Sequence, residues 1–404
     1  MTKHSREYEK SHPWLTFRLD LRDAPPAFWI ALGECQSKCE HISGVPLRPD
    51  IARTLHQVYL AKGVWGTTAI EGNTLSEEEV LKHLDGKLNV PPSKEYLKQE
   101  IDNIINESNR MLETIHRGES LVLTVPRIKE INRAMLHRLT LEPGVTSGEI
   151  RAYSVGVMNY RGAPAKDCEY LFEKLCDWLN GPDFQPQAGL GSMHMAILKA
   201  IIGHLYVEWI HGFGDGNGRT GRLIEAQMLL AEGVPSPASH LLSNHYNLTR
   251  QEYLRQLRAA SESGGKVMPF LAYAVTGFVD GLKEQIAYIR QLHLDVAWLN
   301  YIHEVFHHQN TRAAARQKAL ILDISTKSDP VPMGEMDQVS PRVAKLYAGM
   351  HARTCSRDVD LLKEKGLLIS QGNGYIANQS LIRQFLPVKA KGQSATPNSP
   401  ATRE

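Results

Sequence analysis

The chain has 404 residues, a length that indicates two or three domains. Hydrophobic residues make up 42% of it, enough to bury true cores, which excludes a chain disordered throughout. The 46 basic and 44 acidic residues leave a net charge of +2, so no global polybasic surface for nucleic acid or anionic membrane is expected. Its five cysteines are scattered, which argues against a disulfide framework and favours a reducing compartment.

Helical periodicity dominates the first 290 residues. Residues 1–25 are polar and end in two prolines, which predicts a loosely held arm. The Gly-rich segment 147–162 places Val155 and Val157 two apart and predicts a short hairpin. No apolar leader precedes the first helix and no stretch approaches eighteen apolar residues, so we expect a cytoplasmic protein that makes no membrane contact. Helices are expected over 28–42, from 51 onward, and over 77–84, 94–115, 128–139, 169–179, 192–210, 219–231, 250–260 and 268–289.

The region after residue 291 has a different pattern of elements. It predicts helices over 294–308, 313–324 and 340–346, then a turn and helix from 352 to 365. Residues 368–376, with Gly372 and Gly374 at a turn, predict a two-stranded wing. This order resembles a winged helix-turn-helix, a module that binds DNA through its second helix or serves in protein docking and dimerisation. Residues 388–404 are poor in apolar side chains and are predicted to form a disordered tail.

The charges of this C-terminal region leave DNA binding open. A homodimer is left open as well. Basic side chains are interleaved with acidic ones in this region. The basic residues are Arg353, Arg357, Lys363 and Lys365, and the acidic residues are Asp337, Asp358, Asp360 and Glu364. A salt series would decide, because phosphate contacts give a steep salt dependence.

One segment concentrates residues suited to chemistry, and it reads HGFGDGNGRTGR from His211 to Arg222. His211 comes at the end of a predicted helix, a glycine-dense loop follows, and a second helix begins near Arg219. Successive backbone N–H groups ahead of a helix N-terminus form a cradle for phosphates. Arg219 and Arg222 lie three apart and are expected to clamp further phosphate oxygens.

Three other side chains complete this predicted site. Asp215 offers a hard carboxylate for Mg²⁺ beside bound phosphates. His211 has the intrinsic pKa to accept a proton from a hydroxyl. Phe213 is the only large apolar residue in the loop and is expected to pin it to the core.

Glycine-rich loops also occur in two other nucleotide-binding patterns. Gly216, Gly218 and Gly221 match a dinucleotide-binding fingerprint, but that site needs a preceding strand, and the preceding segment has helical periodicity. No P-loop pattern is present. Taken singly, a histidine at a helix end is usually a cap and Asp-Gly-Asn-Gly is usually a turn; the combined pattern favours a catalytic site.

The segment matches every fixed position of HxFx(D/E)GNGRxxR, the motif of the Fic family. By this resemblance the chain is identified as a member of that family. The resemblance covers roughly residues 125–290. Upstream, residues 67–73 (TTAIEGN) resemble the family's inhibitory helix (S/T)xxxE(G/N), whose N-terminal position is typical of class II. The resemblance implies a mainly α fold, a Fic-type helical bundle with a short β-hairpin flap, followed by the winged-helix-like domain.

Fic proteins mostly transfer AMP from ATP to a Ser, Thr or Tyr hydroxyl of a protein, or of themselves, and release pyrophosphate. By resemblance, His211 is the general base, Asp215 holds Mg²⁺, Arg219 supports the pyrophosphate and Arg222 contacts the γ-phosphate. The other residues implied to bind nucleotide are Gly216, Asn217, Gly218, Thr220, Gly221 and Tyr253. The residues implied to dock the target on the flap are Val155, Gly156, Val157 and Met158.

The resemblance also implies autoinhibition by Glu71, which is expected to form a bidentate pair with Arg222 and so keep it from the γ-phosphate. The domains expected are an N-terminal helical region over 1–120, a catalytic core over 121–290, a winged-helix-like domain over 291–387 and the tail. Two alternatives stay open: removal of AMP or transfer of another phosphate-linked group by the same site, and a DNA-binding regulator whose core only senses nucleotide.

Overall fold

The computed structural model describes residues 6–157 and 160–383. It divides into two compact units, Met1–Ala287 and Tyr288–Glu404, and the boundary falls within α12 (Met268–Val305). The sequence predicted two separate helices here, over 268–289 and 294–308, and the predicted break between them is wrong. The intervening residues Arg290–His293 include no glycine or proline, so nothing in them ends a helix. The predicted tail, 388–404, lies outside the described residues.

The first unit is a helical bundle with one short hairpin. Its elements are α1 (Tyr8–Ser11), α2 (Pro26–Gly44), α3 (Pro49–Ile70), α4 (Glu77–Leu84), η1 (Pro92–Lys94), α5 (Glu95–His116), α6 (Val125–Met135), β1 (Gly156–Val157), β2 (Tyr160–Arg161), α7 (Ala165–Leu179), η2 (Pro182–Phe184), α8 (Ser192–Ile210), α9 (Asn217–Ala231), η3 (Ser236–Ala238), α10 (Leu241–Leu248) and α11 (Arg250–Glu262). The mainly helical fold expected from the sequence is confirmed.

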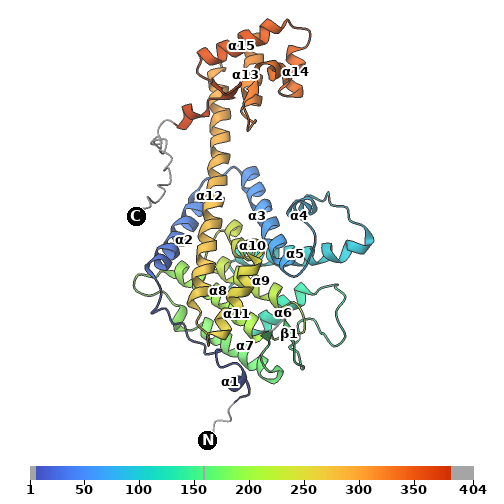
Figure 1. Ribbon diagram of the computed structural model, residues 1–404, viewed down its shortest axis with the longest axis vertical. Coiled ribbons are helices and arrows are strands. Elements are labelled where there is room, and N and C mark those ends of the chain that lie inside the picture. The colour runs from blue at the N-terminus through green and yellow to red at the C-terminus, as the bar shows by residue number, and fades with distance from the viewer. Residues whose placement is uncertain (1–5, 158–159, 384–404) are drawn as a thin grey trace, which may run out of the picture. The chain divides into compact units, whose positions relative to one another are not determined.

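Helix α8 is the centre of this bundle, and α9 packs along it (Figure 1). Almost every α8 side chain is buried, because the helix is apolar on all sides. Gly221 of α9 allows the close approach, since a Cβ there would lie 3.0 Å from Cδ2 of His204. In the same way, a Cβ on Gly63 of α3 would lie 2.2 Å from Cβ of His240, next to α10. The chain segments that carry the predicted site are therefore held by close helix packing.

The described part of the N-terminal arm, residues 6–25, is packed against the bundle and not loosely held, contrary to the prediction. His12 is buried, with Nε2 2.9 Å from the carbonyl oxygen of Arg161 in β2. The backbone N–H of Tyr8 donates to Asp167 of α7, and the side chain of Leu15 is buried. Apolar and aromatic side chains scattered through a polar segment were enough to fix it to the bundle, although they form no periodic pattern.

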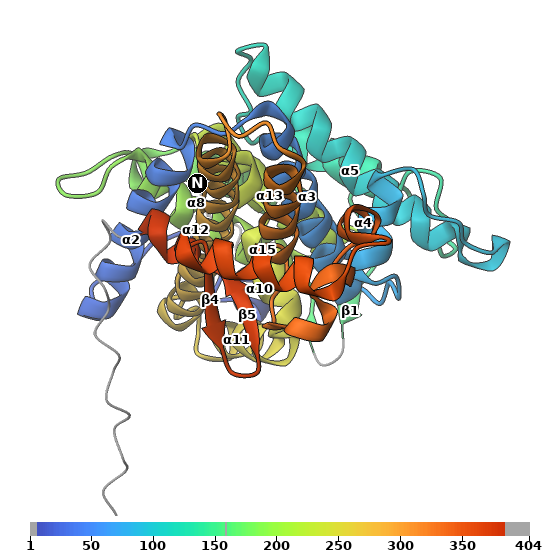
Figure 2. The same ribbon diagram turned by 90° about the horizontal axis from the view of Figure 1, so that it is seen from above.

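The second unit has its own hydrophobic core, in which Trp298 of α12 and Leu320 are almost fully buried. After α12 its elements are α13 (Arg312–Ile324), β3 (Val331–Pro332), η4 (Met333–Gln338), α14 (Pro341–Tyr347), α15 (Ala352–Glu364), β4 (Leu368–Gln371), β5 (Gly374–Ala377) and η5 (Gln379–Arg383). The predicted hairpin is formed by β4 and β5, which lie beside α15 (Figure 2). Strand β3, which the sequence analysis did not predict, pairs with β5 and gives the sheet order β3-β5-β4.

Buried Asp358 of α15 connects three helices of this unit. It accepts hydrogen bonds from Arg316 Nε at 3.0 Å, Gln317 Nε2 at 2.8 Å and the Tyr347 hydroxyl at 3.0 Å. This carboxylate therefore serves the packing of the unit and is not part of its surface charge. Across the described residues, no helix combines the length and apolar character that crossing a membrane requires.

Candidate active site

His211 follows the last residue of α8 and adopts the left-handed conformation, with φ of 49°. That conformation is unfavourable for a residue with a side chain, so the surrounding bonds must hold it. The His211 N–H donates to the Val207 carbonyl at 2.9 Å, and its own carbonyl accepts from Arg151 Nε at 2.7 Å. Burial lowers the pKa of the imidazole, with Glu208 opposing the shift. A neutral imidazole at neutral pH is the form that can accept a proton.

The loop after His211 is closed by its own side chains. Asn217 Oδ1 accepts from the Phe213 N–H and Asn217 Nδ2 donates to the Phe213 carbonyl, both at 2.9 Å. The Phe213 ring is buried against Phe172 at 5.6 Å between centroids, which confirms that it pins the loop to the core. Gly216, with φ of 75°, makes the turn into α9. Because the Asn217 amide bonds to both backbone groups of Phe213, this side chain fixes the shape of the loop.

Two residues that the sequence analysis did not assign to the site support this loop from other segments. Asn132 of α6 is fully buried; its Nδ2 donates to the Asp215 carbonyl at 2.9 Å and its Oδ1 accepts from the Gly148 N–H at 2.9 Å. Arg151, besides holding His211, donates to the carbonyls of Tyr153 and Ala163 at 2.5 and 2.6 Å. Neither carries a sequence signal, since an asparagine in a helix and an arginine near a hairpin are ordinary.

Glu71 and Arg222 are brought together, as the sequence predicted. Glu71 caps the C-terminal end of α3, and its Oε1 lies 2.5 Å from Nη2 of Arg222, whose side chain is 1% exposed. The same nitrogen donates to the Thr67 carbonyl at 3.1 Å. The contact joins one oxygen to one nitrogen, so the expected bidentate geometry is not found. Burial opposes the charged guanidinium, but Glu71 and Glu208 raise the pKa of Arg222 overall.

Arg219 takes a different direction from Arg222, although both begin α9. Its Nη1 donates to Glu100 of α5 at 2.9 Å and its Nη2 to Asp215 Oδ1 at 3.2 Å. Glu100 Oε2 in turn accepts from Asn73 Nδ2 at 2.9 Å, two residues after Glu71. Glu100 carries no sequence signal for a place in the site, because it lies in a helix whose periodicity indicates only an amphipathic element.

A buried polar network lies beneath the two arginines. His204 sits between Glu225 at 3.3 Å and Glu208 at 3.6 Å, and its Nε2 is 3.0 Å from the Tyr253 hydroxyl. Burial would lower the pKa of His204, but the two carboxylates raise it to about 9. Tyr253 is 1% exposed and stacks on Tyr246. Tyr253, together with buried Thr220 and with Gly221, therefore faces the core in this structure and not an open nucleotide surface.

The predicted hairpin is present next to the loop. Strands β1 and β2 pair antiparallel, with Gly156 opposite Arg161 and Val157 opposite Tyr160. The segment before them is joined to the loop, because the Arg151 N–H donates to the Gly212 carbonyl at 3.0 Å. Met158 lies outside the described residues, and a role of Val155, Gly156 and Val157 in docking a target remains a prediction.

The residues at the loop fit a magnesium ion shared with phosphates. The Asp215 side chain is 48% exposed, beside the backbone turn of Gly216. Over the described ranges, no cluster of three His, Cys, Asp or Glu side chains forms a metal site by itself. One carboxylate supplemented by phosphate oxygens and water is the way Mg²⁺ is commonly held at nucleotide sites.

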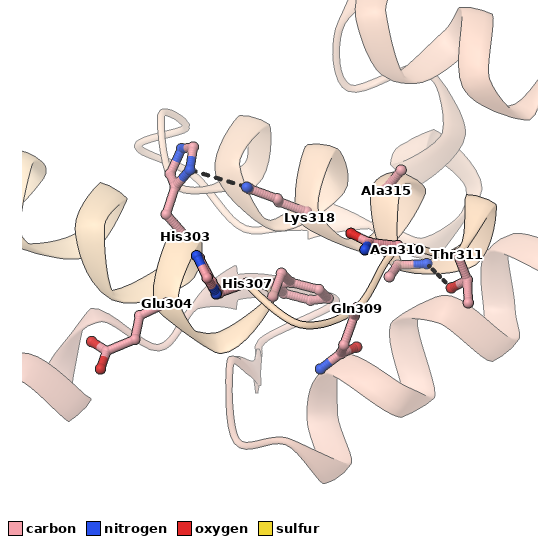
Figure 3. Close-up of a pocket in the computed structure, with 10 residues that line it drawn as sticks. His303, Glu304, His307, Gln309, Asn310, Thr311, Ala315 and Lys318 are labelled. Atoms are coloured by element: carbon pink, nitrogen blue, oxygen red, sulfur yellow. Dashed lines mark hydrogen bonds between the residues drawn. The ribbon is translucent and has the colours of Figure 1, made fainter.

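A separate hollow of about 560 Å³ lies in the second unit, between the end of α12 and the start of α13 (Figure 3). Its lining includes His303, His307, Thr311 and Lys318, and Nδ1 of His303 lies 3.0 Å from Nζ of Lys318. None of the residues predicted to bind nucleotide lines this hollow.

Comparison with known proteins agrees with this geometry. Residues 122–229 match the family model described as Fic/DOC family. The chain is 28% identical over 225 residues to a protein adenylyltransferase Fic of Nematostella vectensis, covering 55% of this chain and 47% of that one. It is 28% identical over 232 residues to a protein adenylyltransferase fic-1 of Caenorhabditis elegans, covering 55% and 40%. The chain thus spans less than half the length of these relatives.

Solved structures show the same fold. A Fic family protein from Desulfovibrio desulfuricans aligns with a TM-score of 0.54 at 19% identity, covering 89% of this chain and 98% of that one. The fic-1 protein of C. elegans aligns with a TM-score of 0.51 at 23% identity, covering 66% and 73%. The chain therefore carries a Fic domain on a Fic-type helical fold.

Proposed function

We propose that this protein is an autoinhibited protein adenylyltransferase, which transfers AMP from ATP to a Ser, Thr or Tyr hydroxyl of a target protein or of itself. The observation that carries the proposal is the His211–Arg222 segment, in which His211 at the end of α8 is followed by a glycine turn that opens α9 with two buried arginines. The names of the relatives support the same activity.

The site offers each group that nucleotidyl transfer needs. Backbone amides of the turn and the N-terminus of α9 would hold the phosphates. Asp215 would hold Mg²⁺, which lowers the negative charge of the triphosphate. The Nε groups of Arg219 and Arg222 are buried and, within the described chain, find no acceptor, so both arginines retain a donor for an anion.

The reaction follows from these positions. The incoming hydroxyl oxygen bonds to the α-phosphorus while the bond from that phosphorus to the bridging oxygen of the β-phosphate breaks, and pyrophosphate leaves. Neutral His211 accepts the hydroxyl proton. Arg222 cannot grip a γ-phosphate while it is bound to Glu71, so the protein in the described state is held inactive.

Intact-mass spectrometry after incubation with ATP and Mg²⁺ tests the proposal. Glu71→Gly should gain one AMP unit more readily than the unaltered chain, and Glu71→Gly combined with His211→Ala should gain none. A gain of bare phosphate, or equal results in all three proteins, would contradict it.

A second candidate function, DNA binding by the C-terminal unit, is favoured by one observation. Asp358, one of the acidic residues that oppose such a role in the sequence, is buried, whereas Arg353, Arg357 and Lys363 of α15 are exposed. Filter binding of duplex DNA over a salt series tests this, since phosphate contacts make affinity fall steeply with salt.

A further inference from the structure

The site contains a second ion pair that mirrors the one between Glu71 and Arg222. Arg219 is bound by Glu100 at 2.9 Å, and the two side chains are 7% and 17% exposed. Most of this contact is therefore shielded from water. A charge-assisted hydrogen bond is stronger in such a shielded place than at the protein surface. With Nη2 directed to Asp215, two carboxylates neutralise the Arg219 guanidinium.

The two ion pairs are held by one segment of chain. Glu71 binds Arg222, and two residues later Asn73 donates from Nδ2 to Glu100 at 2.9 Å and to the Leu97 carbonyl at 2.9 Å. Asn73 is itself 7% exposed, and its Oδ1 accepts from the Leu75 N–H, so its side chain has a fixed orientation. The segment after α3 thus contacts Arg222 directly and Arg219 through Glu100.

We infer that Glu100 is a second inhibitory, positioning residue, which withholds Arg219 from the phosphates in the same state in which Glu71 withholds Arg222. The inference rests on the proposed function and adds to it a residue on α5. Its physical reason is that carboxylates already bind both terminal nitrogens of Arg219, Nη1 by Glu100 and Nη2 by Asp215, so the guanidinium is held toward these residues. Removing Glu71 alone therefore frees Arg222 from its carboxylate, and removing Glu100 as well leaves Asp215 as the one carboxylate bound to Arg219 among the described residues.

Binding of nucleotide to the full-length chain tests this without relying on transfer. Every protein titrated carries His211→Ala, which prevents turnover, and Glu71→Gly, which frees Arg222. Adding Glu100→Gln should tighten binding of Mg-ATP and of Mg-pyrophosphate by about tenfold, as expected for losing one competing charged hydrogen bond. Binding of AMP, which lacks the phosphates assigned to Arg219, should not change.

The control is Glu113→Gln, which makes the same charge change at an exposed position of the same helix and should leave all three affinities unaltered. Weaker or unchanged binding of Mg-ATP in the Glu100 variant would overturn the inference, because Glu100 would then orient Arg219 productively or act only in folding. An equal change for AMP and ATP would do the same.

The outcomes separate this inference from the proposed function. If Glu71→Gly gains no AMP but Glu100→Gln still tightens binding of Mg-pyrophosphate, the adenylyltransferase proposal fails and the role of Glu100 stands. If transfer occurs and the affinities do not move, only the role of Glu100 fails.

Discussion

Glu71 reaches Arg222 past Gly218, where an added Cβ would lie 2.1 Å from Oε1 of Glu71 and would force the carboxylate to shift. Gly218, in the first turn of α9, thus leaves room for the carboxylate that binds Arg222, whereas Gly216 makes the turn into that helix. Under the proposed function, the Glu71 carboxylate and the phosphates of a bound nucleotide would compete for this same space beside Arg222.

The pH dependence of transfer should reflect the lowered pKa of His211. Its neutral form is the active one, and burial holds its pKa below the ordinary value of about 6.5. In the Glu71→Gly variant, kcat should therefore stay high as the pH falls through 6.5 and decline only below it. An acidic limb that lies above 6.5 in the pH–rate profile would contradict the assignment of His211 as the base.

Stability at alkaline pH should depend on His204. Its folded pKa of about 9 exceeds the unfolded value of about 6.5, so its contribution is fully present below pH 6.5 and is lost as pH rises through 9. Urea unfolding of the unaltered chain should show a falling free energy of unfolding across this range.

The variant His204→Gln isolates that effect. It removes the cation that lies between the buried carboxylates of Glu208 and Glu225, which should cost about 3–5 kcal/mol at pH 6.5, and its stability should vary less between pH 6.5 and 9. A parallel pH dependence in both proteins would show that other groups cause the decline.

The loop should weaken when Asn132 is shortened. Asn132→Ala removes the donor to the Asp215 carbonyl and the acceptor for the Gly148 N–H, and leaving such buried groups unsatisfied costs about 1–3 kcal/mol each. Affinity for Mg-ATP, measured by calorimetry in the Glu71→Gly background, should fall as well. Asn109→Ala, an exposed change on α5, is the control and should affect neither quantity.

Helix α3 should transmit a packing change to Glu71. A side chain at Gly63 meets His240, so Gly63→Ala must push α3 away from the α10 side and should cost about 1–3 kcal/mol of stability. Because Glu71 caps the same helix, its contact with Arg222 should loosen and AMP incorporation should rise.

The matched control for that change is Gly33→Ala in α2, where no atom lies within 4 Å of the added Cβ. It should stabilise the helix by up to about 1 kcal/mol and leave incorporation unchanged. Lower stability of Gly63→Ala with unchanged incorporation would show that α3 packing and the Glu71 contact are independent.

Local sequence was sufficient for the elements whose signal is local. The motif from His211 to Arg222 predicted a helix, a glycine loop and a second helix, and Phe213 was expected inside because it is the only large apolar residue there. The hairpin around Val157 and the turn at Gly372 follow from spacing and turn residues. The Glu71–Arg222 contact was predicted only through a resemblance, since nothing local connects residues 151 positions apart.

Tertiary structure decided which partners these residues have. Asn132, Arg151 and Glu100 reach the loop from three separate segments, and a helical asparagine or glutamate looks the same in sequence whether it faces solvent or a buried arginine. The pairing of Arg219 with Glu100 and the burial of Tyr253 depend on how the helices pack, and Gly221 allows α9 to approach α8 closely. Periodicity records which face of a helix is apolar, but the identity of the polar group opposite is fixed only when the helices are brought together, because hydrogen bonds and ion pairs act over a few ångströms.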